Sequence, residues 1–327
     1  MGFSEFHYTA VIRTLGTAGE KYQILLDSLC KQTIQPDTIL VYIPEGYLLP
    51  KETSGKEVYI RCKKGMIHQR SLPFDEVKTD WILFCDDDIS LAKDSVERLW
   101  QGVCTDRNST CISPDVFPNS EASFIKKIQN GLGFTLPHYK KAWAFIVRKS
   151  GHYSYNNIKR EKRSVVLRSQ SAAGPCCLIH KETYKAIHFE DERFLDDFKY
   201  PLGEDCLFYY KLYRMGFNPL VHYDSGIVHL DAGSSYVKDQ KERLKLSNAS
   251  LYVVWHRCLF STTKKSTEKI RYGLCYWTTV VLTVVYMTFT GLLSFKICKP
   301  IWYLSGIIYG IRYTHSKKYK ELPPYLS

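Results

Sequence analysis

The 327 residues are enough for one large domain or two modest ones, and a 45% hydrophobic content with 14% aromatic residues is typical of an ordered protein. The net charge of +12 favours anionic partners, namely nucleic acid, anionic lipid or phosphorylated substrates. Nucleic acid is disfavoured because the sequence has no helix-turn-helix, zinc-finger or RNA-stacking motif.

The first two-thirds of the chain alternates predicted strands and helices. Strands are predicted at Thr9–Ile12, Thr38–Ile43, Val58–Ile60 and Trp81–Cys85. The last of these is a continuous apolar run, typical of a strand covered on both faces. Apolar residues repeat at helical spacing from Tyr22 to Leu29 and from Ala92 to Trp100. This order predicts an α/β fold with a mostly parallel central sheet flanked by helices, in which ligands bind beyond the carboxyl ends of the strands.

The middle of the chain, residues 119–169, is less regular and carries a basic cluster from Arg148 to Arg168. Two interpretations stay open: a mobile loop over the binding site, and a solvated basic surface. A further helix is predicted from Glu204 to Tyr213, with Gly216 at its end.

The C-terminal part changes character after a charged, solvated helix predicted at Lys238–Lys245. Tyr272–Phe295 contains no charged residue, and a membrane span needs about 20 mainly apolar residues. A shorter apolar run, Ile301–Ile311, follows, and both runs are rich in the Tyr and Trp found at lipid interfaces. We therefore predict a main domain at 1–240 and a helical, membrane-associated segment at 241–327. A spanning hairpin, helices lying at the membrane surface, and packing on the main domain or on a second copy all stay open.

The eleven cysteines predict no disulfide or zinc framework, because their number is odd and none forms a CxxC pair. We expect small buried hydrophobes with reduced thiols. Residues 1–8 lack the basic stretch and apolar core of a secretory signal. The main domain is therefore expected in the cytosol.

Three adjacent carboxylates, Asp86-Asp87-Asp88, follow the buried strand directly. They repel one another and call for a positive partner, for which a Mg²⁺ or Mn²⁺ ion bridging two phosphates is suited. Alternate residues of an extended chain point the same way, so Asp86 and Asp88 are predicted to act together. The alternative is a solvated acidic loop that caps the next helix.

Two further features carry candidate chemistry. Glu204 and Asp205 open a predicted helix, where carboxylates are also common for structural reasons. The functional interpretation is that Asp205 projects into a pocket as a general base. His229 follows a short β-like stretch, and a neutral imidazole there would supply a third metal ligand. A purely structural histidine is the alternative.

Taken in order, these motifs resemble family 2 glycosyltransferases with the GT-A fold over about residues 8–235. The segments that carry the resemblance are Val11–Gly16, Ser28–Pro36, Gly65–Arg70, Trp81–Asp88, Gly174–Ile179, Phe189–Phe194, Gly203–Asp205 and Tyr213–Phe217.

The resemblance implies roles for individual residues. The nucleotide of the donor would meet Arg13, Thr14, Arg70 and Asp86. A divalent metal, Mn²⁺ or Mg²⁺, would be held by Asp88, Asp86 and His229. Asp205 would be the catalytic base, with Glu204 shaping its surroundings. Many members end the second strand in one or two aspartates, whereas this sequence has Tyr42-Ile-Pro-Glu-Gly46, which leaves Glu45 as the candidate nucleotide contact and the base of the nucleotide open.

The function so implied is inverting transfer of one sugar from a nucleotide-sugar donor to a saccharide or lipid-linked saccharide acceptor. Basic residues of the middle segment would assist the departing diphosphate. The Q-x-x-R-W motif of processive synthases is absent. Bacterial surface-polysaccharide synthesis on the cytoplasmic face of the inner membrane is the implied setting. A catalytically inactive, membrane-tethered scaffold and a nucleotidyltransferase are the alternatives, although the latter lacks its glycine-rich signature after the first strand. A homodimer is left open.

Overall fold

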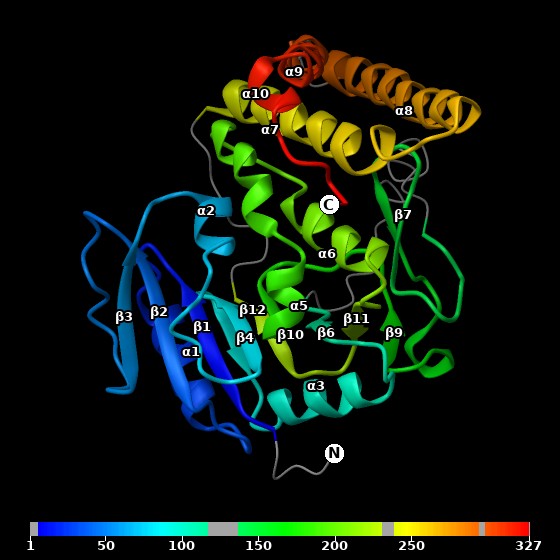
Figure 1. The fold of residues 1–327 in the computed structure, drawn as a ribbon. Helices are drawn as coiled ribbons and strands as arrows, with labels where there is room; N and C mark the ends of the chain where they lie inside the picture. The colour runs from blue at the N-terminus through cyan, green and yellow to red at the C-terminus, as the bar shows by residue number, and fades with distance from the viewer. Residues whose placement is uncertain (1–5, 117–136, 231–238, 294–297, 327) are drawn as a thin grey trace.

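A computed structural model of the chain describes residues 6–116, 137–230, 239–293 and 298–326. Its centre is an eight-stranded sheet with helices packed on it (Figure 1). The strands are β1 (Tyr8–Arg13), β2 (Thr38–Pro44), β3 (Glu57–Cys62), β4 (Trp81–Asp86), β6 (Cys111–Pro114), β9 (Val166–Arg168), β10 (Cys176–His180) and β11 (Leu220–His222). They lie in the order β3-β2-β1-β4-β10-β6-β11-β9, and four of the seven neighbouring pairs are parallel. The predicted α/β class is confirmed.

Both faces of this sheet are covered, as the apolar runs predict. Ala10 and Ile12 of β1 pack with α1 (Glu20–Cys30) and α3 (Ser95–Cys104), whereas Val11 packs in the core on the opposite side. Side chains alternate along a strand, so a strand with apolar residues at every position needs cover on both faces. The second cover includes α5 (Lys181–Ala186) and α6 (Glu204–Arg214). The eleven cysteines are free thiols, and seven of them are buried.

A two-stranded ribbon lies beside the end of β4. In it β5 (Ile89–Leu91) pairs antiparallel with β12 (Ile227–His229), and His229 lies opposite Ile89. The amide of Leu230 also donates a hydrogen bond to the carbonyl of Asp88 at 2.8 Å. This ribbon therefore holds His229 next to the three aspartates.

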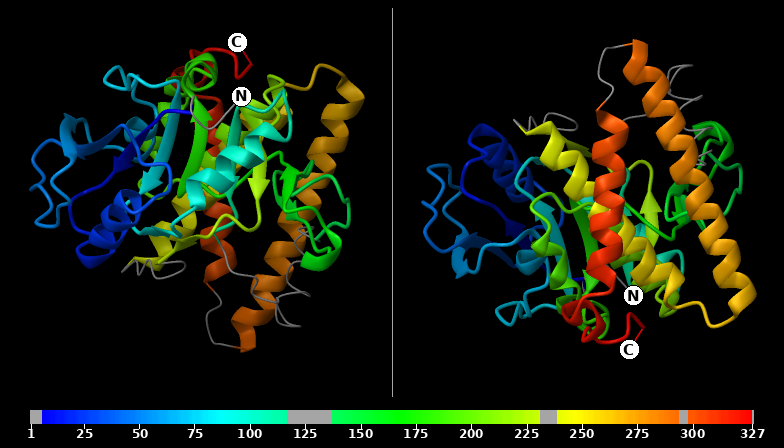
Figure 2. Two further views of the ribbon diagram at one scale, coloured as in Figure 1. Left: turned by 90° about the horizontal axis from the view of Figure 1, so that it is seen from below. Right: turned by 90° about the horizontal axis from the view of Figure 1, so that it is seen from above.

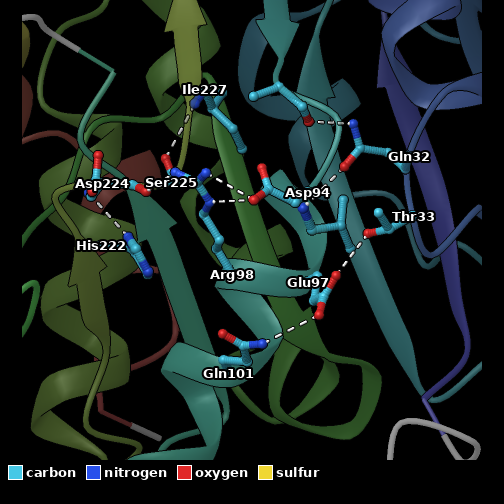
Figure 3. Close-up of polar contacts among 12 residues, drawn as sticks. Gln32, Thr33, Asp94, Glu97, Arg98, Gln101, His222, Asp224, Ser225 and Ile227 are labelled. Carbon is cyan, nitrogen blue, oxygen red and sulfur yellow. Dashed lines mark hydrogen bonds and ion pairs between the residues drawn. The ribbon is translucent and has the colours of Figure 1, made fainter.

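A network of polar contacts connects the segments on either side of the β5–β12 ribbon (Figure 3). The side-chain amide of Gln32, after α1, donates to the carbonyl of Ala92 at 2.7 Å and accepts from the amide of Val96 at 3.1 Å. Arg98 of α3 donates to the carbonyl of Asp224 in the turn before β12 at 2.9 Å. One network thus joins the end of α1, the start of α3 and the turn that leads to His229.

One predicted helix boundary is wrong, and one segment is more regular than expected. Helix α3 begins at Ser95 and not at Ala92, because the Ala92 amide donates to the Gly226 carbonyl at 2.9 Å and extends the β5 connection. The middle segment also contains more structure than expected. Residues 117–136 lie outside the described residues, but the remainder forms β7 (Phe145–Val147) paired with β8 (Tyr153–Tyr155), a short 3-10 turn at Arg160–Lys162, and β9 in the main sheet.

The C-terminal helices pack on the sheet domain. They are α7 (Gln240–Trp255), a π-helical turn (His256–Phe260), α8 (Ser266–Leu293), α9 (Lys299–Thr314) and α10 (Lys317–Lys320). Of the solvated helix predicted at Lys238–Lys245, residue 238 lies outside the described residues, and the part from Gln240 onward is only the beginning of α7. Tyr252, Val253 and Trp255, later in α7, are buried in the same core as β1 and β4. Residues 239–326, as far as described, thus share a core with the sheet, and the division at residue 240 stays a prediction about role.

A buried ion pair fastens the C-terminal segment to the sheet domain. The Glu192 carboxylate is fully buried and accepts two hydrogen bonds from the Arg257 guanidinium, at 3.0 and 3.1 Å. Arg257 also donates to the carbonyl of Pro323 at 2.6 Å. The Tyr325 hydroxyl donates to the carbonyl of Leu207 at 2.7 Å. The end of the chain is therefore tied back to α6.

Replacing Arg257 by alanine is expected to lower the free energy of unfolding by about 3–5 kcal/mol, because it leaves a buried carboxylate without its main partner. Urea unfolding measures this loss. Arg312→Ala is the matched control: its side chain is exposed, so the change should stay within about 0.5 kcal/mol. A loss of less than about 1 kcal/mol for Arg257→Ala would contradict a fastening role for the pair.

Candidate active site

An open cavity of about 400 Å³ lies beyond the carboxyl ends of β1 and β4. It is lined by Arg13, Thr14, Leu15, Thr17, Ala18, Lys21, Met66, Gln69, Arg70, Asp86, Asp87 and Asp88. Five of the residues predicted from the sequence are thereby brought together: Arg13, Thr14, Arg70, Asp86 and Asp88. Lys21 and Gln69 were not predicted, because nothing in their local sequence distinguishes them from ordinary helix residues.

Each of the three aspartates at this cavity contacts different side chains. Asp86 is paired with Arg13 at 2.7 Å and with Arg70 at 3.2 Å. Asp87 accepts a hydrogen bond from the Thr14 hydroxyl at 2.5 Å. Asp88 lies 3.1 Å from the Nε2 atom of His229. The expectation that Asp86 and Asp88 act together through strand alternation does not hold, because β4 ends at Asp86 and the next two residues form a turn.

Sheet register explains the pairing of Arg13 with Asp86. The two residues lie opposite each other at the ends of the parallel strands β1 and β4. The Arg13 side chain is only 10% exposed, and its guanidinium lies 5.4 Å from the centre of the Phe84 ring. A guanidinium that is largely shielded from water needs a counter-ion, and Asp86 supplies it.

Arg70 connects the two halves of the site. It ends α2 (Met66–Arg70) and reaches Asp86 at 3.2 Å, Asp205 at 2.9 Å and Glu204 at 3.5 Å. Burial opposes its charge, but these three carboxylates together raise the pKa of Arg70 above its ordinary value. A permanently charged guanidinium therefore joins the end of β4 to the start of α6.

Glycine at position 174 makes room for Asp205. The Gly174 amide donates to the Asp205 carboxylate at 3.1 Å. A Cβ atom at this position would lie 2.0 Å from Oδ1 of Asp205 and 2.8 Å from Nη1 of Arg70. The sequence resemblance includes the segment that begins at Gly174. It does not reveal that Gly174 makes room for Asp205, because the two residues are 31 positions apart in the sequence.

The two carboxylates that open α6 have perturbed protonation. Burial raises the pKa of Asp205, although Arg70 opposes this rise. Burial and the neighbouring Asp205 raise the pKa of Glu204 to about 7, again against the effect of Arg70. Partly buried carboxylates with raised pKa values that line a pocket are typical of proton-transfer sites.

A further residue positions Arg70. The Asp196 carboxylate accepts hydrogen bonds from the amides of Ile67 and His68, at 2.9 and 2.8 Å, and so caps the short helix that carries Arg70. The Tyr184 hydroxyl donates to the Arg70 carbonyl at 3.1 Å. Neither role was predicted, because Asp196 and Tyr184 lie more than 100 positions from α2 in the sequence.

The predicted three-ligand metal site needs a correction. Within the described ranges, no three His, Cys, Asp or Glu side chains converge as metal ligands. Asp86 is engaged by two arginines, which leaves Asp88 and His229 as the adjacent pair. This pair still fits Mg²⁺ or Mn²⁺, because such ions are commonly held by one or two protein ligands together with phosphate oxygens and water. Burial raises the pKa of Asp87 to about 6, and the neighbouring Asp86 and Asp88 add to the rise.

Other predicted contacts lie away from the cavity. Glu45 is exposed at the end of β2 and does not line it. Nor does any described residue of the basic middle segment. There, Arg160 pairs with Asp224 at 2.6 Å, and Arg168 pairs with Asp106 at 2.9 Å. These two contacts are consistent with the basic-surface interpretation of the middle segment. The basic side chains that line the cavity with the aspartates are instead Arg13, Lys21 and Arg70.

Residues 51–187 match the sequence model of the family described as "Glycosyl transferase family 2". This segment, less than half of the chain, is similar to glycosyl transferase family 2. The matched segment includes β4, the three aspartates, Arg70 and Gly174. Asp205 and His229 come after the matched segment. A search of curated proteins finds no match.

Solved structures share the fold. The crystal structure of GalNAc-T7 with UDP, GalNAc and Mn²⁺ is similar with a TM-score of 0.50 at 14% identity, covering 88% of this chain and 58% of that one. That of *S. aureus* TarS 1-349 in complex with UDP-GlcNAc has a TM-score of 0.51 at 12% identity, covering 94% and 81%. The chain thus spans little more than half of the GalNAc-T7 chain. At these identities the likeness is one of fold, the GT-A fold.

Proposed function

We propose that this chain is an inverting, metal-dependent glycosyltransferase that moves one sugar from a nucleotide-sugar donor to a hydroxyl of a saccharide acceptor. The observation that carries the proposal is the bridge made by Arg70. Through it, the aspartates at the end of β4, which line the cavity, are linked to Glu204 and Asp205, which line a smaller neighbouring pocket that also contains Arg13 and Arg70. Donor diphosphate and acceptor hydroxyl would meet across this bridge.

Asp205 is proposed as the base. It would take the proton of the acceptor hydroxyl as the oxygen attacks the anomeric carbon, and the nucleoside diphosphate would leave from the opposite side. Arg13 and Arg70 line the cavity and would face the negative charge that develops on the diphosphate. A divalent ion held by Asp88 and His229 would supply Lewis-acid stabilisation of that leaving group. The ligands in the two similar structures, UDP, GalNAc and Mn²⁺ in one and UDP-GlcNAc in the other, support a nucleotide-sugar donor.

The acceptor and setting follow from the C-terminal segment. One described helix, α8, is long and apolar enough to associate with a membrane. A basic protein with such a helix is suited to an anionic membrane surface. We therefore propose a lipid-linked saccharide acceptor on the cytoplasmic face of a bacterial inner membrane, in surface-polysaccharide synthesis.

The stereochemistry of donor hydrolysis tests the proposal without knowledge of the acceptor. Many transferases slowly pass their sugar to water, and a single displacement gives the inverted anomer first. With a UDP-sugar and Mn²⁺, proton NMR at early times should therefore detect the sugar anomer opposite to that in the donor. First release of the retained anomer would contradict Asp205 as the base of a single displacement. Absence of turnover with UDP-, GDP- and dTDP-sugars, for a folded protein, would favour the inactive scaffold.

The rate of turnover is expected to depend on pH through Asp205. The base must be deprotonated, and burial raises its pKa above the ordinary 3.8. The value of kcat should therefore fall as pH drops through this raised pKa, approaching tenfold per unit below it. Arg70→Gln removes the charge that opposes the rise, so the acid limb should move to higher pH. A pH profile of kcat for both proteins measures this, and a limb that moves to lower pH in Arg70→Gln would contradict the assignment.

A further inference from the structure

Helix α8 has two distinct faces. On the inner face, the Tyr276 ring stacks on the Trp255 ring of α7 with centroids 4.2 Å apart, and Val280 is 4% exposed. On the outer face, large apolar side chains recur at helical spacing along nearly the whole helix, each 58–64% exposed: Ile270, Leu274, Val281, Val285, Phe289 and Leu292. The exposed stripe therefore runs along the helix and is not confined to one end.

The neighbouring helix α9 is fixed to the body of the protein. A Cβ atom at Gly306 would lie 2.3 Å from the Lys245 carbonyl oxygen, and one at Gly310 would lie 2.8 Å from the Ala249 carbonyl oxygen. The backbones of α9 and α7 thus touch at two successive turns. At the far end of α9, the Tyr313 hydroxyl donates to Asp197 at 2.6 Å. Helix α9 cannot leave α7 without exposing this tight contact.

The two helices form one flat layer. Helix α9 runs back beside α8, and both helices lie on the same side of the molecule, above α7 (Figures 1 and 2). The outer face of α9 adds Ile301, Leu304 and Ile308, which are 67%, 38% and 49% exposed. We call these three residues and the six outer residues of α8 the apolar layer.

Charged residues are concentrated at the ends of this layer. No Asp, Glu, Lys or Arg occurs from Tyr272 to Leu293, so the charged residues of α8, which are Glu268, Lys269 and Arg271 around Ile270, are confined to its first two turns. Lys264 and Lys265 are exposed just before α8, and Lys317, Lys318 and Lys320 are exposed after α9. An apolar helical face flanked by basic residues is typical of proteins that lie in the headgroup region of an anionic bilayer.

We propose that the apolar layer docks flat on an anionic lipid bilayer, with α8 in the plane of the interface and not across the membrane. At 28 residues α8 is long enough to cross. Crossing would, however, separate Tyr276 from Trp255 and uncover the inner face of α8. Lying flat buries the outer stripe and keeps every inner contact. The inference deepens the membrane association proposed above but does not depend on the catalytic proposal.

Vesicle flotation of the full chain tests the docking. The probe is a vesicle of phosphatidylcholine with 30% phosphatidylserine, to which the protein is added by dilution from detergent. Val281→Glu/Val285→Glu/Phe289→Glu should reduce the floated fraction at least tenfold. The control Leu48→Glu/Leu49→Glu/Val58→Glu makes the same charge change at exposed apolar residues of the β2–β3 edge, and it should float like the wild type. Equal flotation of both variants and the wild type would overturn the proposal.

Topology and self-association are tested on the same samples. A membrane-impermeant thiol reagent trapped inside the vesicles should not modify Cys298, which is exposed at the start of α9. Modification from inside would mean that α8 crosses the membrane and would overturn the flat arrangement.

Light scattering in detergent-free buffer measures whether the apolar layer instead binds a second copy of the chain. Conversion of a dimer to a monomer by the α8 variant, with flotation unchanged, would assign the layer to an interface between copies. Donor binding should be equal in wild type and both variants, so failure of docking is separable from failure of the catalytic proposal.

Discussion

Replacing Asp205 by asparagine is expected to lower the rate of sugar transfer by about 10²–10⁴-fold, because an amide cannot accept the proton of the acceptor hydroxyl. The side chains have nearly the same shape, so the contacts of Asp205 with Arg70 and Gly174 need only small adjustment. Donor affinity should change little, since Asp86 and Asp88 stay in place. Turnover and donor binding measured on the same preparation test both statements.

The neighbouring carboxylate is the matched control for Asp205. Glu204 lies one residue away, is also held near Arg70, and has a pKa raised to about 7 by burial and by Asp205. Glu204→Gln should cost less than Asp205→Asn if Glu204 only shapes the surroundings. Wild-type turnover in Asp205→Asn would remove this residue from the role of base, and an equal or larger loss in Glu204→Gln would transfer that role to Glu204.

Replacing Gly174 by alanine is expected to reduce turnover by about 10²-fold although the substitution adds a single methyl group. The new Cβ would lie 2.0 Å from Oδ1 of Asp205, so the carboxylate must move. A displacement of about 1 Å at a reacting group can cost about 10²-fold in rate. The thermal stability of the variant measures how much of the effect is structural.

The control for Gly174→Ala is another glycine with open surroundings. A Cβ atom at Gly273 of α8 meets nothing within 4 Å, so Gly273→Ala should leave turnover unchanged. Undiminished turnover in Gly174→Ala, with the fold intact, would mean that Asp205 does not need the position seen in the structure.

The strands and helices of the sheet domain were predictable because each one is indicated by the pattern of apolar residues within its own segment. Continuous apolar runs predicted β1, β2 and β4 to within two residues, and helical spacing predicted α1 and α6. Helix α7 was misjudged because its charged first turns suggest a solvated helix, whereas Tyr252, Val253 and Trp255 become buried only when the helix packs on the sheet domain. Burial of that kind is set by tertiary packing, which composition does not reveal.

The site was predictable only in part, for a related reason. Asp86, Asp88 and Asp205 stand in recognisable local sequences, so their types and positions indicated chemistry. Their partners depend on contacts between distant segments. The alternation argument for Asp86 and Asp88 was wrong because β4 ends at Asp86. Asp196, which caps α2 from 129 positions away, had no local signature at all.

The most direct test of the central claim is metal-dependent binding of a nucleotide sugar at the three aspartates. Thermal unfolding of the wild type and Asp88→Ala should be followed with UDP-, GDP- and dTDP-sugars, each with Mn²⁺, Mg²⁺ or EDTA. A donor at 100 times its Kd stabilises the folded state by about 2.7 kcal/mol. One class of nucleotide sugar should raise the unfolding temperature of the wild type with metal, and by much less with EDTA or in Asp88→Ala. An unfolding temperature that no donor raises, or one raised equally in Asp88→Ala, would contradict the account.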